Sequence, residues 1–181
     1  MSVFSVLIKG IDYLNDKIGK LIAYLAVLMM LIVTYEVMMR YLFRSPTIWA
    51  LEINQTLLCI YSALAGGYTL LNQGHVNVEI VYQYFSPKTK LIIDLITYIF
   101  FFGFMVVLLK ETYKMAFESV MINERSLSLL GLPLYPAKIS IALGSLLLLL
   151  QGISNFIKKV ISLISGIEPE KPKSIFTISK R

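Results

Sequence analysis

The sequence predicts an all-α membrane protein with four transmembrane helices. Three observations lead to this fold class. Apolar residues make up 57% of the 181 residues, and the mean hydropathy is more strongly positive than is usual for a soluble domain. Four apolar runs approach the length of a membrane span, and the charged residues lie between these runs rather than inside them.

Two of the four runs are long enough to span a bilayer without help. Residues 53–73 and 139–157 are 21 and 19 residues without a charge. At 1.5 Å per residue they reach about 28–31 Å, and a hydrocarbon core is about 30 Å thick. The uncharged parts of the other two runs, 21–35 and 95–109, reach the length of a membrane span only together with the residues that flank them. We therefore predict one domain over 1–165 whose spans are about 20–40, 53–73, 91–110 and 139–157.

The two ends of the chain differ from the spans. In the first 20 residues, apolar residues recur at helical spacing and charged residues occupy much of the rest. This pattern predicts an amphipathic helix lying in the cytoplasmic interface, with a bend at Gly19. The alternative is a plain helical extension of the first span. Residues 166–181 are rich in Pro, Glu, Lys and Ser, which predicts a disordered cytoplasmic tail.

The positive charges are distributed unevenly between the two sides of the membrane. Four spans place both termini and the middle connection on one side. That side carries eleven of the 17 bases: Lys9, Lys17, Lys20, Lys88, Lys90, Lys158, Lys159, Lys171, Lys173, Lys180 and Arg181. The positive-inside rule then places both termini in the cytoplasm. The net charge of +6 does not indicate nucleic-acid binding, because no soluble domain is predicted that could present a basic face.

The most distinctive stretch lies between the first two spans, at residues 35–53. It carries Glu36, Arg40, Arg44 and Glu52 directly beside hydrocarbon-like sequence. A charge near the bilayer centre costs about 2.5–3.5 kcal/mol, so we expect these residues at the outer membrane face. Glu36 and Arg40 are four residues apart and can pair on one helix face, with an Arg40–Glu52 pair as the alternative. We expect the charges to close the first helical hairpin, and Arg44 to contact solvent or lipid phosphate.

Several smaller features indicate where helices begin and end. Pro46 ends the first span, and Thr47 is expected to cap the next helix. Trp49 is then placed at headgroup level, where tryptophan is common. The third span is expected to continue as a helix beyond the membrane to about residue 123. Asp94 is expected at the N-terminus of that helix, where the helix dipole favours an acid.

The residues that commonly carry chemistry are scarce. The chain has one histidine, His75, and one cysteine, Cys59. This excludes bis-histidine haem ligation within the chain, His-Glu-x-x-His zinc chemistry and cysteine clusters. The spans also lack the internal repeats and mid-span breaks typical of carriers with a substrate site at the membrane midplane. We therefore predict no cofactor and no enzymatic activity, and a protein that binds another protein.

Three local patterns resemble a known family. They are Arg40 followed, after a Pro-containing turn, by Trp49-x-x-Glu52; Gly74-His75-Val76-x-Val78-Glu79 at the end of the second span; and Gly131-x-Pro133 before the last span. In their order and spacing, and in the size and four-span layout, the chain resembles the DctQ-like small membrane subunit of tripartite ATP-independent periplasmic (TRAP) transporters. The candidate structural or partner-interface residues are therefore Glu36, Arg40, Arg44, Trp49, Glu52, Gly74, His75, Glu79, Gly131 and Pro133.

The resemblance implies a function that composition alone does not. In the family, the small subunit pairs with a large multi-span subunit that carries the substrate and sodium sites, and a soluble periplasmic binding protein delivers an organic acid such as a dicarboxylate or sialic acid. The implied role is a non-catalytic scaffold in the bacterial inner membrane. Two other classes are the alternatives. A membrane anchor of a redox enzyme complex needs haem or quinone ligands, and this chain offers only His75. A small self-assembling channel needs a polar stripe through a span, and the chain lacks one.

Overall fold

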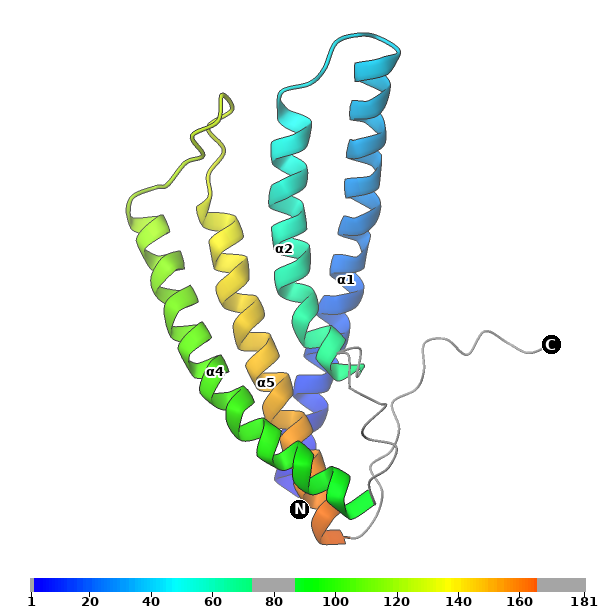
Figure 1. The fold of residues 1–181 in the computed structure, drawn as a ribbon, viewed down its shortest axis with the longest axis vertical. Coiled ribbons are helices and arrows are strands. Elements are labelled where there is room, and N and C mark those ends of the chain that lie inside the picture. Colours follow the sequence, from blue (N-terminus) through cyan, green and yellow to red (C-terminus); the bar gives the residue numbers. More distant parts are fainter. Residues whose placement is uncertain (1, 73–86, 166–181) are drawn as a thin grey trace, which may run out of the picture.

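The computed structural model describes residues 2–72 and 87–165, and within these ranges the fold is helical. The helices are α1 (Ser2–Tyr41), α2 (Trp49–Leu71), α4 (Pro87–Met121) and α5 (Tyr135–Ser165). They run alternately in opposite directions (Figure 1). We call the end that holds the start of α1 and the end of α5 the inner end. The opposite end, with the connections 42–48 and 122–134, is the outer end.

Three of the four helices are long and apolar enough to cross a membrane. They are α1, α4 and α5, over Val6–Tyr41, Ile92–Met121 and Tyr135–Leu163. α2 has 23 residues, or about 34 Å, which is sufficient length for a span. It is not among the described helices that combine this length with sufficient hydropathy over a full span. Three helices thus indicate a multi-pass membrane protein, and a fourth crossing by α2 remains a prediction.

α1 is one uninterrupted helix of 40 residues. It does not end at Gly19, so the amphipathic segment and the first span form one element, as in the alternative of a helical extension. Gly19 serves packing instead, because a Cβ at this position would lie 2.2 Å from ring atoms of Tyr68 on α2. The interfacial position of the first turns of α1 remains a prediction.

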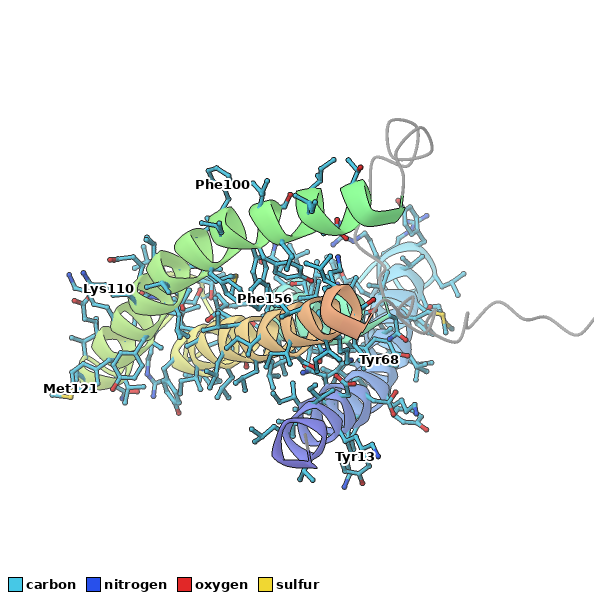
Figure 2. The ribbon with its side chains drawn as sticks, turned by 90° about the horizontal axis from the view of Figure 1, so that it is seen from below. Tyr13, Tyr68, Phe100, Lys110, Met121 and Phe156 are labelled. Carbon is cyan, nitrogen blue, oxygen red and sulfur yellow. The ribbon has the colours of Figure 1, made fainter. Side chains whose placement is uncertain are left out.

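The central helix of the fold is α5. It contacts α1, α2 and α4, and from the inner end it lies between α4 on one side and α1 on the other (Figure 2). A third of its apolar span is buried, compared with 6% of the spans of α1 and α4. The outward faces of α1 and α4 carry large exposed apolar side chains such as Tyr24 and Phe100. These faces are suited to lipid or to another membrane protein.

Small residues bring α2 and α5 into backbone contact. A Cβ on Gly144 would lie 2.2 Å from the carbonyl oxygen of Ala63. One turn along α2, a Cβ on Gly67 would lie 2.0 Å from Oδ1 of Asn15. Ala63 and Gly67 are four residues apart, the spacing that allows close approach of membrane helices. Ser62 and Gly66 have the same spacing of four residues, but they do not bring two helices into such close contact.

α4 ends close to where the sequence predicts, whereas α5 extends beyond its predicted span. α4 begins at Pro87 and reaches Met121, close to the expected end at residue 123. Asn123 then adopts a φ of 47°, and the backbone N–H of Glu124 bonds to the carbonyl of Ser119 at 3.0 Å, which closes the helix. α5 continues to Ser165, eight residues beyond the predicted span.

Candidate functional site

At the outer end, Glu36 joins the end of α1 to the start of α2. Its Oε1 accepts a hydrogen bond from Nη2 of Arg40 at 2.8 Å. Its Oε2 accepts bonds from both the backbone N–H, at 3.1 Å, and the hydroxyl of Thr47. The Glu36–Arg40 pair is thus formed, while the alternative Arg40–Glu52 pair is not the one observed. Glu36 retains 13% of its side-chain exposure, so this carboxylate is largely enclosed.

The expectation that Thr47 caps α2 was wrong. The residue before α2 is Ile48, which makes no side-chain capping bond, and the Thr47 hydroxyl is bonded to Glu36. α2 begins one residue later than a Thr47 cap requires, and the Thr47 hydroxyl donates a charge-assisted bond to the Glu36 carboxylate. Next to this contact, the rings of Tyr35 and Trp49 stack at 5.8 Å between centroids. Arg44 lies in the turn with a φ of 53° and is exposed.

Glu52 connects the first hairpin to the second. The hydroxyl of Ser128, in the connection between α4 and α5, lies 2.6 Å from both carboxylate oxygens of Glu52. This bond, with a smaller contribution from Ser126, holds the pKa of Glu52 below its ordinary value. No pattern in the sequence predicts this contact, because Ser128 is 76 residues away in a loop.

The connection between α4 and α5 is itself ordered by short-range bonds. The backbone N–H of Ser126 bonds to the carbonyl of Leu132 at 2.8 Å, and that of Leu134 bonds to Glu124 at 3.0 Å. Gly131 has a φ of 60°, a conformation that glycine adopts without strain, so its position in the turn has a physical reason. Pro133 forms an isolated bridge with Arg125.

An ion pair fixes this connection to α5. Lys138 pairs with Glu124, and both side chains remain about a quarter exposed. The bond from Lys138, with a smaller contribution from the hydroxyl of Ser119, lowers the pKa of Glu124. The outer end therefore has two carboxylates with lowered pKa values outside the spans, and each joins two segments.

At the inner end lies a buried polar junction that sequence reasoning missed. Asn15, Gln151 and Ser154 are 1%, 0% and 0% exposed. The amide nitrogen of Asn15 donates to Oε1 of Gln151 at 2.9 Å. The amide nitrogen of Gln151 donates to Oδ1 of Asp12 at 3.0 Å, and the Ser154 hydroxyl donates to the same oxygen at 2.9 Å. α1 is thus bonded to α5 through the buried side chains of Asn15, Gln151 and Ser154 and the partly exposed carboxylate of Asp12.

Two lysines and one asparagine of α5 extend this junction. Lys158 donates to Oδ2 of Asp12 at 2.6 Å. Lys159 pairs with Asp94 of α4. The amide of Asn155 donates to the carbonyl of Leu70, near the end of α2, at 3.2 Å. The polar residues near the inner end of α5 therefore contact all three other helices.

One sequence expectation needs correction here, and other charged residues have partners that were not predicted. Asp12, one of the charged residues among the first 20, bonds to α5. Asp94 was expected at a helix N-terminus, but it lies seven residues inside α4, which begins at Pro87, and it pairs with Lys159. The fourth span was predicted to end at residue 157, and α5 continues beyond it through Lys158 and Lys159, whose charges are paired.

A sequence signal for the junction does exist. On α5, Gln151 is followed after three, four and seven residues by Ser154, Asn155 and Lys158. This spacing places the four polar side chains on one helix face. On α1, Asp12 and Asn15 are three residues apart. A polar stripe inside a predicted span indicates a partner helix rather than lipid, because hydrocarbon satisfies no hydrogen bond.

The remaining expected site residues are not placed. Gly74, His75, Glu79 and the tail 166–181 lie outside the described residues. Within residues 2–72 and 87–165, no group of three or more His, Cys, Asp or Glu side chains could hold a metal ion. The ion pairs Asp12–Lys158 and Asp94–Lys159 join different helices, Glu124–Lys138 joins a connection to α5, and Glu36–Arg40 lies within α1. What this arrangement can do chemically is hold four helices in a fixed relation.

Comparison with known proteins identifies the family. Residues 29–161, well over half of the 181 residues, match the family described as "Tripartite ATP-independent periplasmic transporters, DctQ component". The match begins inside α1 and ends inside α5, so it covers both outer connections. No curated protein gave a significant match. The chain therefore belongs to the DctQ family and is a small membrane subunit of a TRAP transporter.

Proposed function

We propose that the chain is the non-catalytic small permease subunit of a sodium-coupled TRAP transporter in a bacterial inner membrane, and that it acts as a scaffold for the large transport subunit. Membership in the DctQ family supports a role in transport over the redox anchor. The observation that carries the scaffold role is the fastening of the bundle at both of its ends. Glu36 and Glu52 fasten the outer end, and Asp12 and Gln151 fasten the inner end.

A scaffold must resist tilting while a neighbouring domain moves. In this chain the resistance would come from polar contacts that cross between helices, since lipid tails give packed membrane helices little hydrophobic reason to stay together. The outward faces of α1 and α4 carry large exposed apolar side chains and would be available to the large subunit. Both termini lie in the cytoplasm in this arrangement, and α2 supplies the fourth crossing.

Substrate selection belongs to other chains in this proposal. The transported solute is an organic acid, of the dicarboxylate or sialic-acid type, that a periplasmic binding protein delivers to the large subunit. The outer connections 42–48 and 122–134 face the side on which the binding protein docks. Arg44 and Arg125 are exposed there and would offer positive charge to it.

The experiment that tests the scaffold role compares two arginines of the first connection. Arg40→Ala removes the partner of Glu36, whereas Arg44→Ala removes an exposed charge four residues away. Each variant is co-expressed with its large subunit, and the amount of large subunit that co-purifies in mild detergent is measured together with solute uptake. We expect Arg40→Ala to lower both and Arg44→Ala to leave co-purification unchanged. Wild-type complex yield and uptake in Arg40→Ala would count against the scaffold role.

A further inference from the structure

The connection between α4 and α5 presents two leucines to its surroundings. Leu127 is 106% and Leu129 92% exposed, the highest values among the large apolar side chains of the described residues. The serines that alternate with them bond within the chain. The Ser128 hydroxyl bonds to Glu52, and the Ser126 hydroxyl accepts a bond from the backbone N–H of Ser128 at 3.3 Å. The connection is thus polar toward the fold and apolar away from it, the reverse of the usual arrangement. We call Leu127 and Leu129 the leucine tip.

The leucine tip is held in this position by the bonds that order the connection. The backbone N–H of Ser126 bonds to the carbonyl of Leu132 at 2.8 Å, and that of Gly131 bonds to the carbonyl of Ser128 at 3.2 Å. The bond between Ser128 and Glu52 attaches the same segment to α2. The leucines therefore cannot turn inward without breaking these bonds. A group that is already fixed loses less conformational freedom on binding, so the tip is preorganised for a partner.

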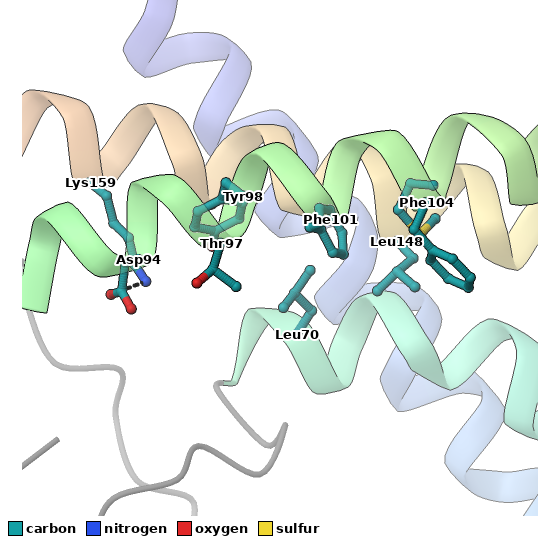
Figure 3. Close-up of a pocket in the computed structure, with 9 residues that line it drawn as sticks. Leu70, Asp94, Thr97, Tyr98, Phe101, Phe104, Leu148 and Lys159 are labelled. Carbon is teal, nitrogen blue, oxygen red and sulfur yellow. Dashed lines mark hydrogen bonds and ion pairs between the residues drawn. The ribbon is translucent and has the colours of Figure 1, made fainter. Parts of the chain in front are cut away.

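The place of the leucine tip in the chain separates it from the other apolar surfaces. Near the inner end, Leu70, Phe101 and Leu148 line a cleft between helices (Figure 3). Exposed apolar side chains along the spans, such as Phe100, are suited to lipid. The tip instead follows residues 110–118 of α4, which carry four charges and are predicted to continue beyond the membrane. We therefore expect the tip on the outer side, where a soluble protein can reach it.

The charges of the outer end favour an acidic partner. Residues 36–52 and 122–138 contain three acids, and each is already bonded within the chain: Glu36, Glu52 and Glu124. Arg44 and Arg125 are exposed and form no ion pair within residues 2–72 and 87–165. Arg125 makes one long bond, 3.5 Å from Nη1 to the carbonyl of Gly131, and a guanidinium has five N–H donors. The charge that remains for a partner is therefore positive.

We propose that the leucine tip is the contact by which this subunit binds the soluble periplasmic binding protein, and that it enters an apolar depression bordered by carboxylates on that protein. The inference rests on the proposed function, which supplies a soluble partner on the outer side. Two leucines with neighbouring arginines form a small contact, as suits a partner that docks and leaves again, whereas a permanent subunit contact would use a larger apolar face. The arginines would raise the association rate, and the leucines would lower the dissociation rate.

The test uses the full-length chain in complex with its large subunit in lipid nanodiscs. The probe is the substrate-loaded binding protein of the same transporter. Leu127→Ser combined with Leu129→Ser removes the leucine tip. Leu42→Ser combined with Ile48→Ser is the matched control, since these side chains of the other outer connection are 70% and 65% exposed. Arg125→Gln removes a charge beside the tip. All five side chains are exposed, so the thermal unfolding of the variants should match that of the wild type.

Binding is measured by surface plasmon resonance at low and at high salt. We expect the tip variant to bind about tenfold more weakly through faster dissociation, and the control to bind as the wild type does. Arg125→Gln should slow association and reduce its dependence on salt. Equal affinity of the tip variant and the wild type, or an equal loss in the control, would overturn the inference and leave the proposed function standing.

Two further outcomes separate the tip from the rest of the proposed function. If the tip variant lost the large subunit during purification, the leucines would belong to that permanent contact, and the inference would be wrong. If the wild-type complex bound no binding protein at all, the proposed function would be overturned together with the inference.

Discussion

The inner and outer ends of the bundle use similar residue types in different surroundings. At the inner end, Gln151 is 0% exposed and bonds across to α1 from within a helix. At the outer end, Arg40 is 55% exposed, and its partner Glu36 holds a turn. A buried polar group that loses its partner costs more than an exposed one, because water cannot replace the bond. The inner contacts should therefore set stability, and the outer contacts should set the shape of the connections.

The largest effect is expected at the centre of the inner junction. Gln151→Met keeps the side-chain volume but removes the bonds to Asn15 and Asp12. We expect a loss of about 2–4 kcal/mol in the free energy of unfolding, measured in mixed detergent micelles. Gln55→Met, at an exposed position of α2, is the control and should be close to neutral. Equal stability of the two variants would remove the distinction between the ends.

The next effect sharpens the role of close packing beside the junction. In Gly67→Ala the new Cβ would lie 2.0 Å from Oδ1 of Asn15, so Asn15 must move. We expect a loss of about 1–3 kcal/mol. In Gly66→Ala the nearest atoms are carbons of Leu148 at 3.9 Å, and the higher helix propensity of alanine should give a gain of up to about 1 kcal/mol. The same unfolding measurement tests both, and a loss in Gly66→Ala would contradict this account.

A smaller effect is expected from the outer contact. Glu36→Gln removes the charge that Arg40 faces but can still accept from Thr47. We expect a loss in the free energy of unfolding that is smaller than the loss in Gln151→Met. Glu118→Gln is the control, since its pair with Lys114 spans 3.8 Å and both side chains are more than 60% exposed. If Glu36→Gln lowered the free energy of unfolding as much as Gln151→Met, the proposed difference between the two ends would be wrong.

The smallest effect concerns acid. The pKa values of Glu52 and Glu124 are lowered by Ser128 and Lys138. The stability that they contribute is present above their ordinary pKa of 4.5, and it is lost as the pH falls from there through the lowered pKa values of the folded state. The single tryptophan, Trp49, lies one turn from Glu52, so its fluorescence should change in this range. The double variant Glu52→Gln, Glu124→Gln should show no such change.

Much of the fold followed from composition and spacing. The apolar runs predicted where α1, α4 and α5 lie, and Pro46 and Gly131 predicted turns that are present. The Glu36–Arg40 pair could be predicted because both residues lie on one helix at a spacing of four. Local geometry determines each of these features, so the sequence alone was sufficient.

The contacts between helices could not be predicted in the same way. Asp12 and Lys158 are 146 residues apart, and Glu52 and Ser128 are 76 apart. Which faces meet depends on how α5 packs against the other three helices, and this packing depends on small residues such as Gly144. Spacing along one helix shows that a polar stripe exists, but it does not show which partner the stripe has.

The length of α1 has a consequence for the membrane around it. Forty residues make a helix of about 60 Å, whereas a 30 Å core holds about 26 helical residues even at a tilt of 40°. About 14 residues of α1 must therefore project from the hydrocarbon. Polar contacts fasten the helix close to both ends, at Asp12 and at Glu36. A change in bilayer thickness would therefore alter how much of α1 projects, and Lys20 and Glu36, on either side of its uncharged stretch 21–35, would set how far the hydrocarbon extends along the helix.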